Sequence, residues 1–565
     1  MYLFRIFRSF LPLRNPIGFG ASDFVVLALA ILLVGLLIGK SILEPYIRAI
    51  STRTRLCMCL LFGLAIVMRL ALLPQSSVPI PSGADDFSYL LLGDTLAHLR
   101  FANKTHPLHE FFEAVFILQE PAYASIYPMG QGLFLAFGQV LAHSPWVGVL
   151  VSSGLFCALS YWMLRSWVPA VWALVGGLFT AIEFGPLSSW VNSYWGGYVS
   201  AIAGCLVFGA LPRLRQSPRV RNGVLLGVGL GLQALTRPFE AVFLAIMASV
   251  YLAFGLRGKW EVTRKPLVAC ASILVTALGL TLMQNRAVSQ SWSTMPYMMS
   301  RYEYGVPATL TFQPNATPHR KMTAEQELDY RAQSAVHGEG TDSVSEYFQR
   351  FADRCRYLRF FLLPPLYLAI LMFVPSLKQS RYVWVLGTVL LFALGTNVYP
   401  YFYPHYIAAI ACLFVLMSVI GLRRLKGWSR EFVSLSCCAF FIFWYGLYLT
   451  GDNDLLSINA YQSWYYINRG DPQGRDSVEE KLRKAPGQQL VFVRYSASHR
   501  FAEWIHNDAD IDSAPIVWAN DLGQDENNKL LHYYPNRTAW LLEPDAHPIA
   551  LTPYQAEAPA FQTVH

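Results

Sequence analysis

Apolar runs long enough to cross a lipid bilayer recur along most of this 565-residue chain. A helix needs about 20 mostly apolar residues to cross the hydrocarbon core, and it satisfies its own backbone polar groups there. Each run therefore predicts a membrane-spanning helix. We expect about twelve of them, near residues 24–43, 56–73, 145–164, 168–183, 197–212, 223–236, 238–256, 267–284, 358–376, 383–397, 404–421 and 432–450.

The composition agrees with an all-α polytopic membrane protein. Hydrophobic residues make up 54% of the chain and charged residues only 14%, which is far from the average of soluble proteins. The formal net charge of +8 lies mostly in short loops between apolar runs, so it indicates orientation in the membrane and gives no reason to expect nucleic acid as a partner. Eight of the nine cysteines lie inside apolar runs, where they are expected to pack as small hydrophobic residues.

Basic residues predict which loops face the cytoplasm, because Lys and Arg are retained on that side. Four short basic loops are separated by even numbers of spans, as they must be if they share a side: residues 213–221, 257–265, 378–381 and 423–430. The remaining connections then face outward: residues 183–198, 236–240, 285–356, 397–406 and everything after about 451.

The side of the stretch "SGADDFSYLLLGDTLAHLR" (82–100) depends on whether the apolar helix at about 129–142 crosses the membrane. If that helix lies at the interface, Asp85 and Asp86 face outward. If it crosses, they face the cytoplasm. The first choice leaves four basic residues inside and the second leaves five, so charge alone does not decide.

The chain divides into three parts by composition. Residues 1–55 form an extra membrane anchor with a basic loop, and residues 56–450 form the main membrane module, with a first outward loop at 74–128 and a long outward loop at 285–356. Residues 451–565 are predicted to form a small soluble α/β domain. We expect its strands at 488–496, 514–519 and 537–543, and its helices at 500–507 and 523–533.

Asp85 and Asp86 are the first candidates for chemistry. Adjacent carboxylates raise each other's proton affinity, and a nearby apolar surface adds to this effect, so one of them could act as a general base. The amphipathic run that follows, "FSYLLLGDTLAHLRF", would hold the pair at a fixed depth against the bilayer. The alternative is a pair of ordinary solvated loop acids.

Cations occur in other outward loops. Arg237 and Glu240 in "LTRPFEAV" lie between two spans, where unpaired charge is expensive, so they either pair across one helical turn or Arg237 holds a phosphate. Arg301 in "MPYMMSRYEYG" and His405 in "YPYFYPHY" raise the same question. Their alternatives are a solvated loop arginine and an interfacial histidine within an aromatic belt. With Asp85, these residues outline an outward cavity with a base on one wall and cations on the other.

Two further acids are candidates for the acceptor side. Glu183, at the mouth of the second outward loop, could orient the acceptor or a divalent metal ion, although the simpler interpretation is a loop acid with no role. Glu240 is the acid beside Arg237. The metal ion is the one cofactor that the sequence suggests, and the cysteines lack the spacing and histidine partners of a zinc site.

The motifs near the start of the main module resemble the GT-C superfamily of polytopic glycosyltransferases, which includes protein O-mannosyltransferases and aminoarabinose transferases. The resemblance rests on Arg69 at the end of a span ("IVMRLALLP"), the acidic pair, and then "PAYASIYPMGQGLFLAFGQ" (121–139). It covers residues 56–240 best, and the later pieces "NSYWGG", "TRPFEA", "MPYMM" and "FYPHY" look like a bacterial branch of the superfamily.

This resemblance implies that the acidic pair lies at the active site, where Asp85 or Asp86 activates the acceptor. The helix after the "YP" motif is juxtamembrane in the family, which would place the acids outside. Two features depart from the family pattern: the pair is Asp-Asp where the family often has Asp-Glu, and residues 1–55 add a span. That span puts an N-terminus with three arginines outside, against the usual bias.

The implied function is a glycosyltransferase of the bacterial inner membrane, with its active site and C-terminal domain facing the periplasm or the outside. It would transfer a sugar from a polyprenyl-phosphate-linked donor to a glycan, lipid or protein acceptor, among membrane lipids and without nucleic acid. Arg237, Arg301 and His405 would stabilise the departing phosphate. The alternatives are a transporter or flippase, a polymerase or ligase of lipid-linked saccharides, and a non-catalytic assembly subunit; the matched halves typical of transporters are not evident.

Overall fold

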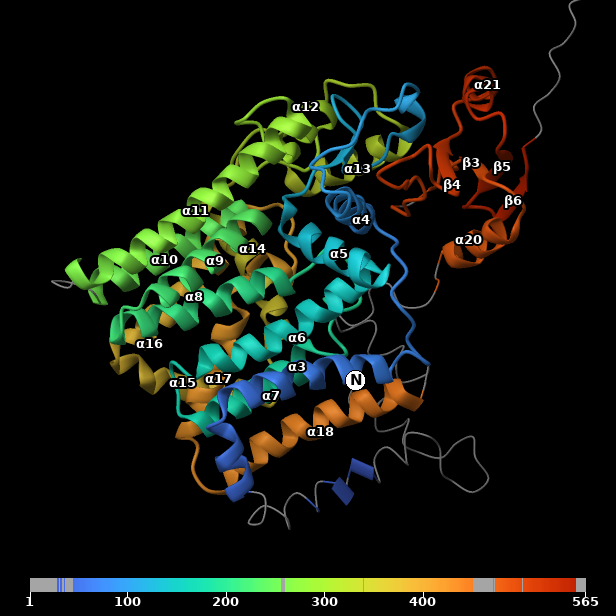
Figure 1. Ribbon diagram of the computed structural model, residues 1–565. Helices are drawn as coiled ribbons and strands as arrows, with labels where there is room; N and C mark the ends of the chain where they lie inside the picture. Colours follow the sequence, from blue (N-terminus) through green and yellow to red (C-terminus); the bar gives the residue numbers. More distant parts are fainter. Residues whose placement is uncertain are drawn as a thin grey trace, which may run out of the picture. The chain divides into compact units, whose positions relative to one another are not determined.

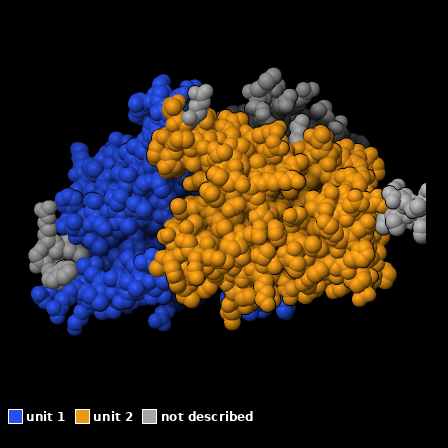
Figure 2. All heavy atoms as spheres, turned by 90° about the horizontal axis from the view of Figure 1, so that it is seen from above, with its two compact units in different colours: residues 1–79, 128–281, 342–469 blue, residues 80–127, 282–341, 470–565 orange. Residues whose placement is uncertain are grey.

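The computed structural model forms two compact units, shown in different colours in Figure 2. It describes residues 28–29, 31–32, 35, 44–255, 260–338, 340–450, 471, 473–499 and 501–554. Unit 1 comprises residues 1–79, 128–281 and 342–469, and unit 2 comprises residues 80–127, 282–341 and 470–565. Each unit is therefore assembled from three separate stretches of the chain.

Unit 1 is a helical bundle whose long helices run roughly parallel to one another (Figure 1). Its helices are α3 (Thr54–Ala71), α5 (Met129–Ala142), α6 (Pro145–Leu164), α7 (Ala170–Phe184), α8 (Tyr198–Gln216), α9 (Val220–Thr236), α10 (Pro238–Gly255), most of α11 (Trp260–Ser289), α14 (Val344–Cys355), α15 (Leu366–Phe373), α16 (Ser380–Gly395), α17 (Ala411–Arg424) and α18 (Trp428–Thr450). Short 3-10 helices lie between them: η2 (Arg356–Phe361), η3 (Val374–Lys378), η4 (Thr396–Val398) and η5 (Pro404–Ile410).

Seven helices among the described residues are long and apolar enough to cross a membrane, or eight if the bent pair Val344–Phe361 and Leu366–Lys378 counts as one span. The chain is thus a polytopic membrane protein, as predicted. Fewer than the expected twelve runs meet this criterion. The run at 197–212 continues into Arg213 and Arg215 in α8, α7 is a shorter apolar helix, and the run at 24–43 lies largely outside the described residues.

Glycines allow several helices of unit 1 to approach closely. A Cβ atom on Gly204 in α8 would lie 1.7 Å from the backbone oxygen of Ala409 in η5, and one on Gly223 in α9 would lie 2.0 Å from that of Pro266 in α11. Only glycine fits at such crossings, which are typical of membrane bundles. The stretch "GVLLGVGLGL" (223–232) therefore serves helix packing, as its position inside a predicted span suggested.

Unit 2 contains a four-stranded sheet with strand order β4-β3-β5-β6. Its strands are β3 (Gln489–Val493), β4 (Ile516–Asn520), β5 (Thr538–Glu543) and β6 (Ala550–Pro553); β3 runs parallel to β4 and β5, and β6 runs antiparallel to β5. β3 is buried along its whole length, as expected of a central parallel strand, and β4 is equally buried although it lies at one edge of the sheet. The predicted α/β character of the C-terminal region is confirmed.

The other elements of unit 2 are helices and two short strands. They are α4 (Ala84–Ala97), the 3-10 helix η1 (His109–Phe112), β1 (Ile117–Leu118), β2 (Ala124–Ser125), α12 (Pro296–Tyr304), α13 (Ala324–His337), α20 (Arg475–Lys484) and α21 (Gln524–Tyr533). α21 matches the predicted helix at 523–533. The predicted helix at 500–507 is wrong, because its described residues are not helical: the Ile505 amide donates to the side chain of Glu503, and the Trp504 amide donates to the hydroxyl of Tyr495.

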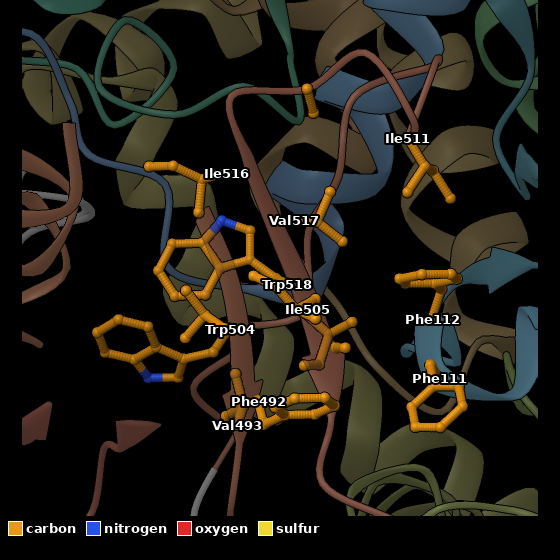
Figure 3. Close-up of a cluster of buried hydrophobic side chains, with 14 of the residues drawn as sticks. Phe111, Phe112, Phe492, Val493, Trp504, Ile505, Ile511, Ile516, Val517 and Trp518 are labelled. Atoms are coloured by element: carbon orange, nitrogen blue, oxygen red, sulfur yellow. The ribbon is translucent and has the colours of Figure 1, made fainter. Parts of the chain in front are cut away.

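The core of unit 2 is shared between residues 80–127 and the C-terminal sheet (Figure 3). Phe111 and Phe112 of η1 are each 2% exposed and belong to the same buried cluster as Phe492 of β3 and Trp518 of β4. The side-chain amide of Asn520 also donates to two backbone oxygens of the loop, at 3.1 and 2.8 Å. The sheet therefore completes its core with residues from a distant part of the chain.

Candidate functional site

The residues singled out by the sequence fall into two groups. Asp85, Asp86 and Arg301 lie in unit 2, whereas Glu183, Arg237, Glu240 and His405 lie in unit 1. We describe each group within its own unit.

The acidic pair occupies the first turn of α4. Carboxylates are favoured there because the helix dipole presents positive charge at its N-terminus. Asp86 is only 3% exposed. The hydroxyl of Tyr127 donates a hydrogen bond to Asp85 Oδ1, and the Tyr127 ring stacks on Tyr89 one turn further along α4, with ring centroids 4.1 Å apart. The side-chain position of Asp85 is thus fixed by an aromatic pair.

α4 is largely buried within unit 2. The sequence suggested an amphipathic run, yet most residues of α4 are buried, including Phe87 and Leu91. Ser88 donates from its hydroxyl to the Phe116 oxygen at 2.7 Å, and the same hydroxyl lies 2.8 Å from that of Ser125. The polar face of the run is therefore used for internal hydrogen bonds, which the hydrophobic pattern could not reveal.

A third carboxyl group, Asp329 of α13, interacts electrostatically with Asp85. The pKa of Asp329 is raised from 3.8 to about 7, first by burial and then by the charges of Asp85 and Glu325. Gln333 opposes this shift by donating to Asp329 Oδ2 at 2.6 Å. Sequence reasoning missed Asp329, because α13 has the polar composition of an ordinary surface helix. The only sequence signal was the four-residue spacing of Glu325 and Asp329, which puts both on one helical face.

The candidate acids do not fit a metal centre. Among the residues that the structure describes, no three or more His, Cys, Asp or Glu side chains come together in a way that could hold a metal ion. The suggested divalent metal ion therefore receives no support from the geometry, and no chemical step below depends on one.

Arg301, in the last turn of α12, contacts the loop that follows this helix. Its Nε donates to the Pro307 oxygen at 2.9 Å and its Nη2 to the Ala308 oxygen at 3.2 Å, while the guanidinium lies 5.8 Å from the ring centroid of Tyr297. These contacts hold the loop in place. A role in binding phosphate stays a prediction.

In unit 1, Arg237 and Glu240 form the predicted ion pair. Arg237 ends α9, and Pro238 prevents the helix from continuing, so that α10 begins in a new direction with Glu240 in its first turn. Arg237 Nη1 lies 3.4 Å from Glu240 Oε1, and Glu240 is 1% exposed. The guanidinium also lies 4.5 Å from the ring centroid of Tyr406. Arg237 is therefore held by a carboxylate and an aromatic face.

His405 lies beside Arg237, within a cluster of aromatic rings. It is near the start of η5, and its ring centroid is 4.8 Å from that of Tyr406, 5.2 Å from that of Trp195 and 5.6 Å from that of Tyr403. The positive charge of Arg237 interacts electrostatically with the side chain of His405. Two of the three predicted phosphate-binding residues thus come together in unit 1.

Glu183 has different surroundings. It lies in the last turn of α7, is 7% exposed, and its Oε2 has no hydrogen-bond partner among the described residues. None of the contacts recorded within the described part of unit 1 joins it to Arg237 or His405. Its role as an acceptor or metal residue stays a prediction.

Arg69 was identified in the sequence only as part of a motif. It lies in the last turn of α3 and holds the segment that follows this helix. It is 1% exposed and donates to Asn192 Oδ1 at 3.2 Å and to the backbone oxygens of Ser76 and Ser77 at 3.0 and 2.9 Å. The guanidinium lies 4.9 Å from the ring centroid of Trp146. Arg69 therefore connects the segment that follows α3 to the loop that contains Asn192.

Comparison with known proteins gives structural matches only. No protein-family model matches this chain, and no curated protein matches it. Among solved structures, ArnT from Cupriavidus metallidurans in the apo state matches with 12% identity and a TM-score of 0.48, covering 86% of this chain and 92% of ArnT. ArnT bound to undecaprenyl phosphate matches with 13% identity and a TM-score of 0.47, with the same coverage.

The archaeal oligosaccharyltransferase AglB from Archaeoglobus fulgidus, in complex with an inhibitory peptide and a dolichol-phosphate, is a further match. Its identity is 11% and its TM-score 0.39, and the alignment covers 86% of this chain and 69% of AglB. ArnT and AglB are GT-C glycosyltransferases, the superfamily that the sequence motifs resemble.

Proposed function

We propose that this protein is a membrane glycosyltransferase that transfers a sugar from a polyprenyl-phosphate-linked donor to a glycan, lipid or protein acceptor on the extracytoplasmic face of the bacterial inner membrane. The observation that carries the proposal is the acidic pair at the start of α4, where Tyr127 fixes Asp85 beside the buried Asp86. A carboxylate held at a defined position is what a general base requires.

In this reaction Asp85 or Asp86 accepts the proton of the acceptor hydroxyl as its oxygen attacks the anomeric carbon of the donor sugar. The bond between that carbon and the phosphate oxygen breaks, and the electron pair leaves with the polyprenyl phosphate. Asp329 is an auxiliary group in this scheme: its carboxyl, whose pKa is about 7, can take up a proton near neutral pH beside the base.

Arg237 and His405 are the proposed contacts for the donor phosphate. The guanidinium fork suits phosphate oxygens, and Glu240 and Tyr406 fix its orientation. Because Glu240 partly offsets the charge of Arg237, the pair suits the single negative charge of a phosphodiester better than the greater charge of a diphosphate. A polyprenyl-phosphate sugar is such a phosphodiester. Arg301 remains a candidate for the same phosphate.

A lipid-linked donor suits the architecture of unit 1. Its isoprenoid tail is apolar and can lie among helices with exposed hydrophobic side chains, such as α10 and α11. Nucleotide sugars are made in the cytoplasm, so a lipid carrier is the reasonable source of activated sugar outside. The placement of the acids outside is part of this proposal, and it follows the motif order around residues 121–139.

The test is to replace Asp85 and Asp86 by Asn, singly and together, in a strain that otherwise lacks the protein. One of the two single variants removes the general base, and we expect its rate of sugar transfer to the cell's glycoconjugate to fall at least about 100-fold. The double variant should have no transfer activity. The glycoconjugate that disappears in the deletion strain is identified first by mass spectrometry, and its formation is then measured in isolated membranes.

Asp510→Asn is the matched control, because Asp510 is an exposed acid of the same unit. Its transfer rate should equal that of the unaltered protein, and all variants should insert in the membrane and melt at similar temperatures. Full activity in the double variant would remove the acidic pair from the mechanism.

A further inference from the structure

Trp195 of the "NSYWGG" stretch has an indole N–H group without an acceptor. Its Nε1 is buried, and no hydrogen-bond partner exists for it among the described residues. The ring centroid of Trp195 lies 5.2 Å from that of His405 and 5.2 Å from that of Tyr403. A buried donor that lacks an acceptor is costly, and native proteins rarely keep one without a reason.

Three other indoles of unit 1 have a backbone acceptor among the described residues. Trp146 donates to the Val191 oxygen at 2.8 Å, Trp167 to the Phe208 oxygen at 2.9 Å, and Trp384 to the Met247 oxygen at 3.0 Å. The bundle therefore supplies backbone acceptors to tryptophans in comparable surroundings. The missing acceptor at Trp195 is a local feature of this site.

The backbone around Trp195 is constrained to present the ring. Gly196 and Gly197 follow it with φ angles of 88° and 146°, which residues with a side chain rarely adopt. A Cβ on Gly196 would lie 2.6 Å from the side-chain oxygen of Gln131, whose amide donates to the backbone oxygen of Tyr194 at 3.0 Å. The two glycines after Trp195 and the Gln131 side chain, which binds the residue before it, thus fix the loop on both sides of the tryptophan.

The neighbours of the Trp195 ring supply further donors. No hydrogen bond joins the ring nitrogens of His405 to the residues that the structure describes. The guanidinium of Arg237, which lies 4.5 Å from the ring centroid of Tyr406, also interacts electrostatically with His405. The one carboxylate in this set, Glu240, is paired with Arg237. Arg237 brings a positive charge to this cluster and Trp195 brings an indole N–H without an acceptor among the described residues, which together form an arrangement expected around an anionic ligand.

We propose that the indole N–H of Trp195 donates a hydrogen bond to a phosphate oxygen of the lipid-linked sugar, beside Arg237 and His405. The assignment rests on the proposed function and adds a binding residue to it. Tyr403, which covers the indole edge-on, has a side chain that is 36% exposed. Rotation of this exposed ring is the movement that would let the phosphate reach Nε1.

The test compares two lipids that differ only in the phosphate. Undecaprenyl phosphate and undecaprenol are titrated against the full-length protein in phosphatidylcholine nanodiscs, and Kd is measured for each. We expect Trp195→Phe to weaken binding of undecaprenyl phosphate about tenfold, the effect of one hydrogen bond to a charged group, and to leave undecaprenol binding unchanged. Incorporation of 3-benzothienylalanine at position 195 keeps the ring shape without the N–H and should give the same result.

Trp384→Phe is the matched control, since it removes an indole N–H that is already satisfied within the bundle. It should leave the affinity for both lipids unchanged. Equal losses for both lipids at position 195, or no loss for either, would overturn the assignment while leaving the proposed function in place. A failure of the unaltered protein to prefer undecaprenyl phosphate over undecaprenol would overturn the proposed function and the assignment together.

Discussion

Asp85 shows how a residue's chemistry depends on distant parts of the chain. Its hydrogen-bond donor, Tyr127, is 42 positions further on, and the carboxyl group that its charge affects belongs to Asp329 in α13. Unit 2 brings these three residues together through tertiary packing. A prediction of how one of these carboxyl groups titrates must therefore include the charges of all three segments.

Asp329 should make the stability of the protein depend on pH. Burial, followed by the charges of Asp85 and Glu325, raises the pKa of Asp329 from 3.8 to about 7. The folded state therefore holds a proton that the unfolded state has lost, and stability should fall as pH rises from about 4 to 7. We expect Asp329→Asn to gain stability at pH 8, on the order of 2 kcal/mol, and to gain little at pH 4.

Thermal unfolding of the detergent-solubilised protein at both pH values measures this difference. Gln333 can still donate to the amide oxygen of an asparagine, so the substitution keeps the hydrogen bond at this position. Asp510→Asn, at an exposed position, should behave like the unaltered protein. An equal gain for Asp329→Asn at pH 4 and pH 8 would show that the carboxyl group does not titrate in this range.

Residues that depend on near neighbours were predicted well from the sequence. The Arg237–Glu240 pair needed only a three-residue spacing between two spans, and the structure confirms it. Asp329 and Trp195 could not be predicted, because their significance comes from Asp85 and His405 in other segments. Local spacing reveals ion pairs on one helix, whereas burial and missing partners become visible only when the chain is folded.

At the scale of helices, the crossing of α8 and η5 controls the position of His405. Gly204 of α8 lies against the backbone of Ala409, and η5 also contains His405. We expect Gly204→Ala to destabilise the protein by about 1–3 kcal/mol, because the two backbones must move apart. It should also weaken binding of undecaprenyl phosphate, since the displaced segment carries a proposed ligand of the phosphate.

Gly63→Ala is the control for this substitution. Gly63 lies in α3 with nothing within 4 Å of an added Cβ, so alanine should be neutral or slightly stabilising there, by about 0.5–1 kcal/mol. Melting temperatures of both variants in one detergent provide the comparison. Equal melting temperatures would mean that α8 and η5 have room that the structure does not show.

Periodicity and composition predicted the secondary structure unevenly. The strands at 488–496, 514–519 and 537–543 were found as β3, β4 and β5, because parallel strands are short apolar runs, of which β3 and β4 are fully buried. The stretch at 501–507 has a helix-like composition, but its backbone amides bond to side chains instead. α4 looked like a surface helix, since nothing local indicates that the C-terminal sheet region packs against it.

At the scale of the whole molecule, three distant segments build unit 2 around one core. The hydroxyl of Tyr123 donates to the Asn507 oxygen at 2.9 Å, and the Ala509 amide donates to Asp94 Oδ2 at 2.7 Å. His499 lies 3.6 Å from Glu325 and so links the C-terminal segment to α13. From composition alone, these segments were predicted to belong to different parts of the chain, because composition contains no information about contacts between distant segments.

This shared core predicts that residues 470–565 do not fold alone. Without residues 80–127, the sheet would lose Phe111, Phe112 and Tyr123, each 2% exposed in the structure. Burying one such side chain contributes about 1.5–3 kcal/mol, so the loss is comparable to the whole net stability of a small domain, about 5–15 kcal/mol.

We expect the isolated fragment of residues 470–565 to give poorly dispersed amide NMR signals and to bind a hydrophobic dye. Fusing residues 80–127 to this fragment through a flexible linker should restore the dispersion of the signals. A cooperative melt of the isolated fragment would mean that the sheet is sufficient by itself and that the loop docks on a finished domain.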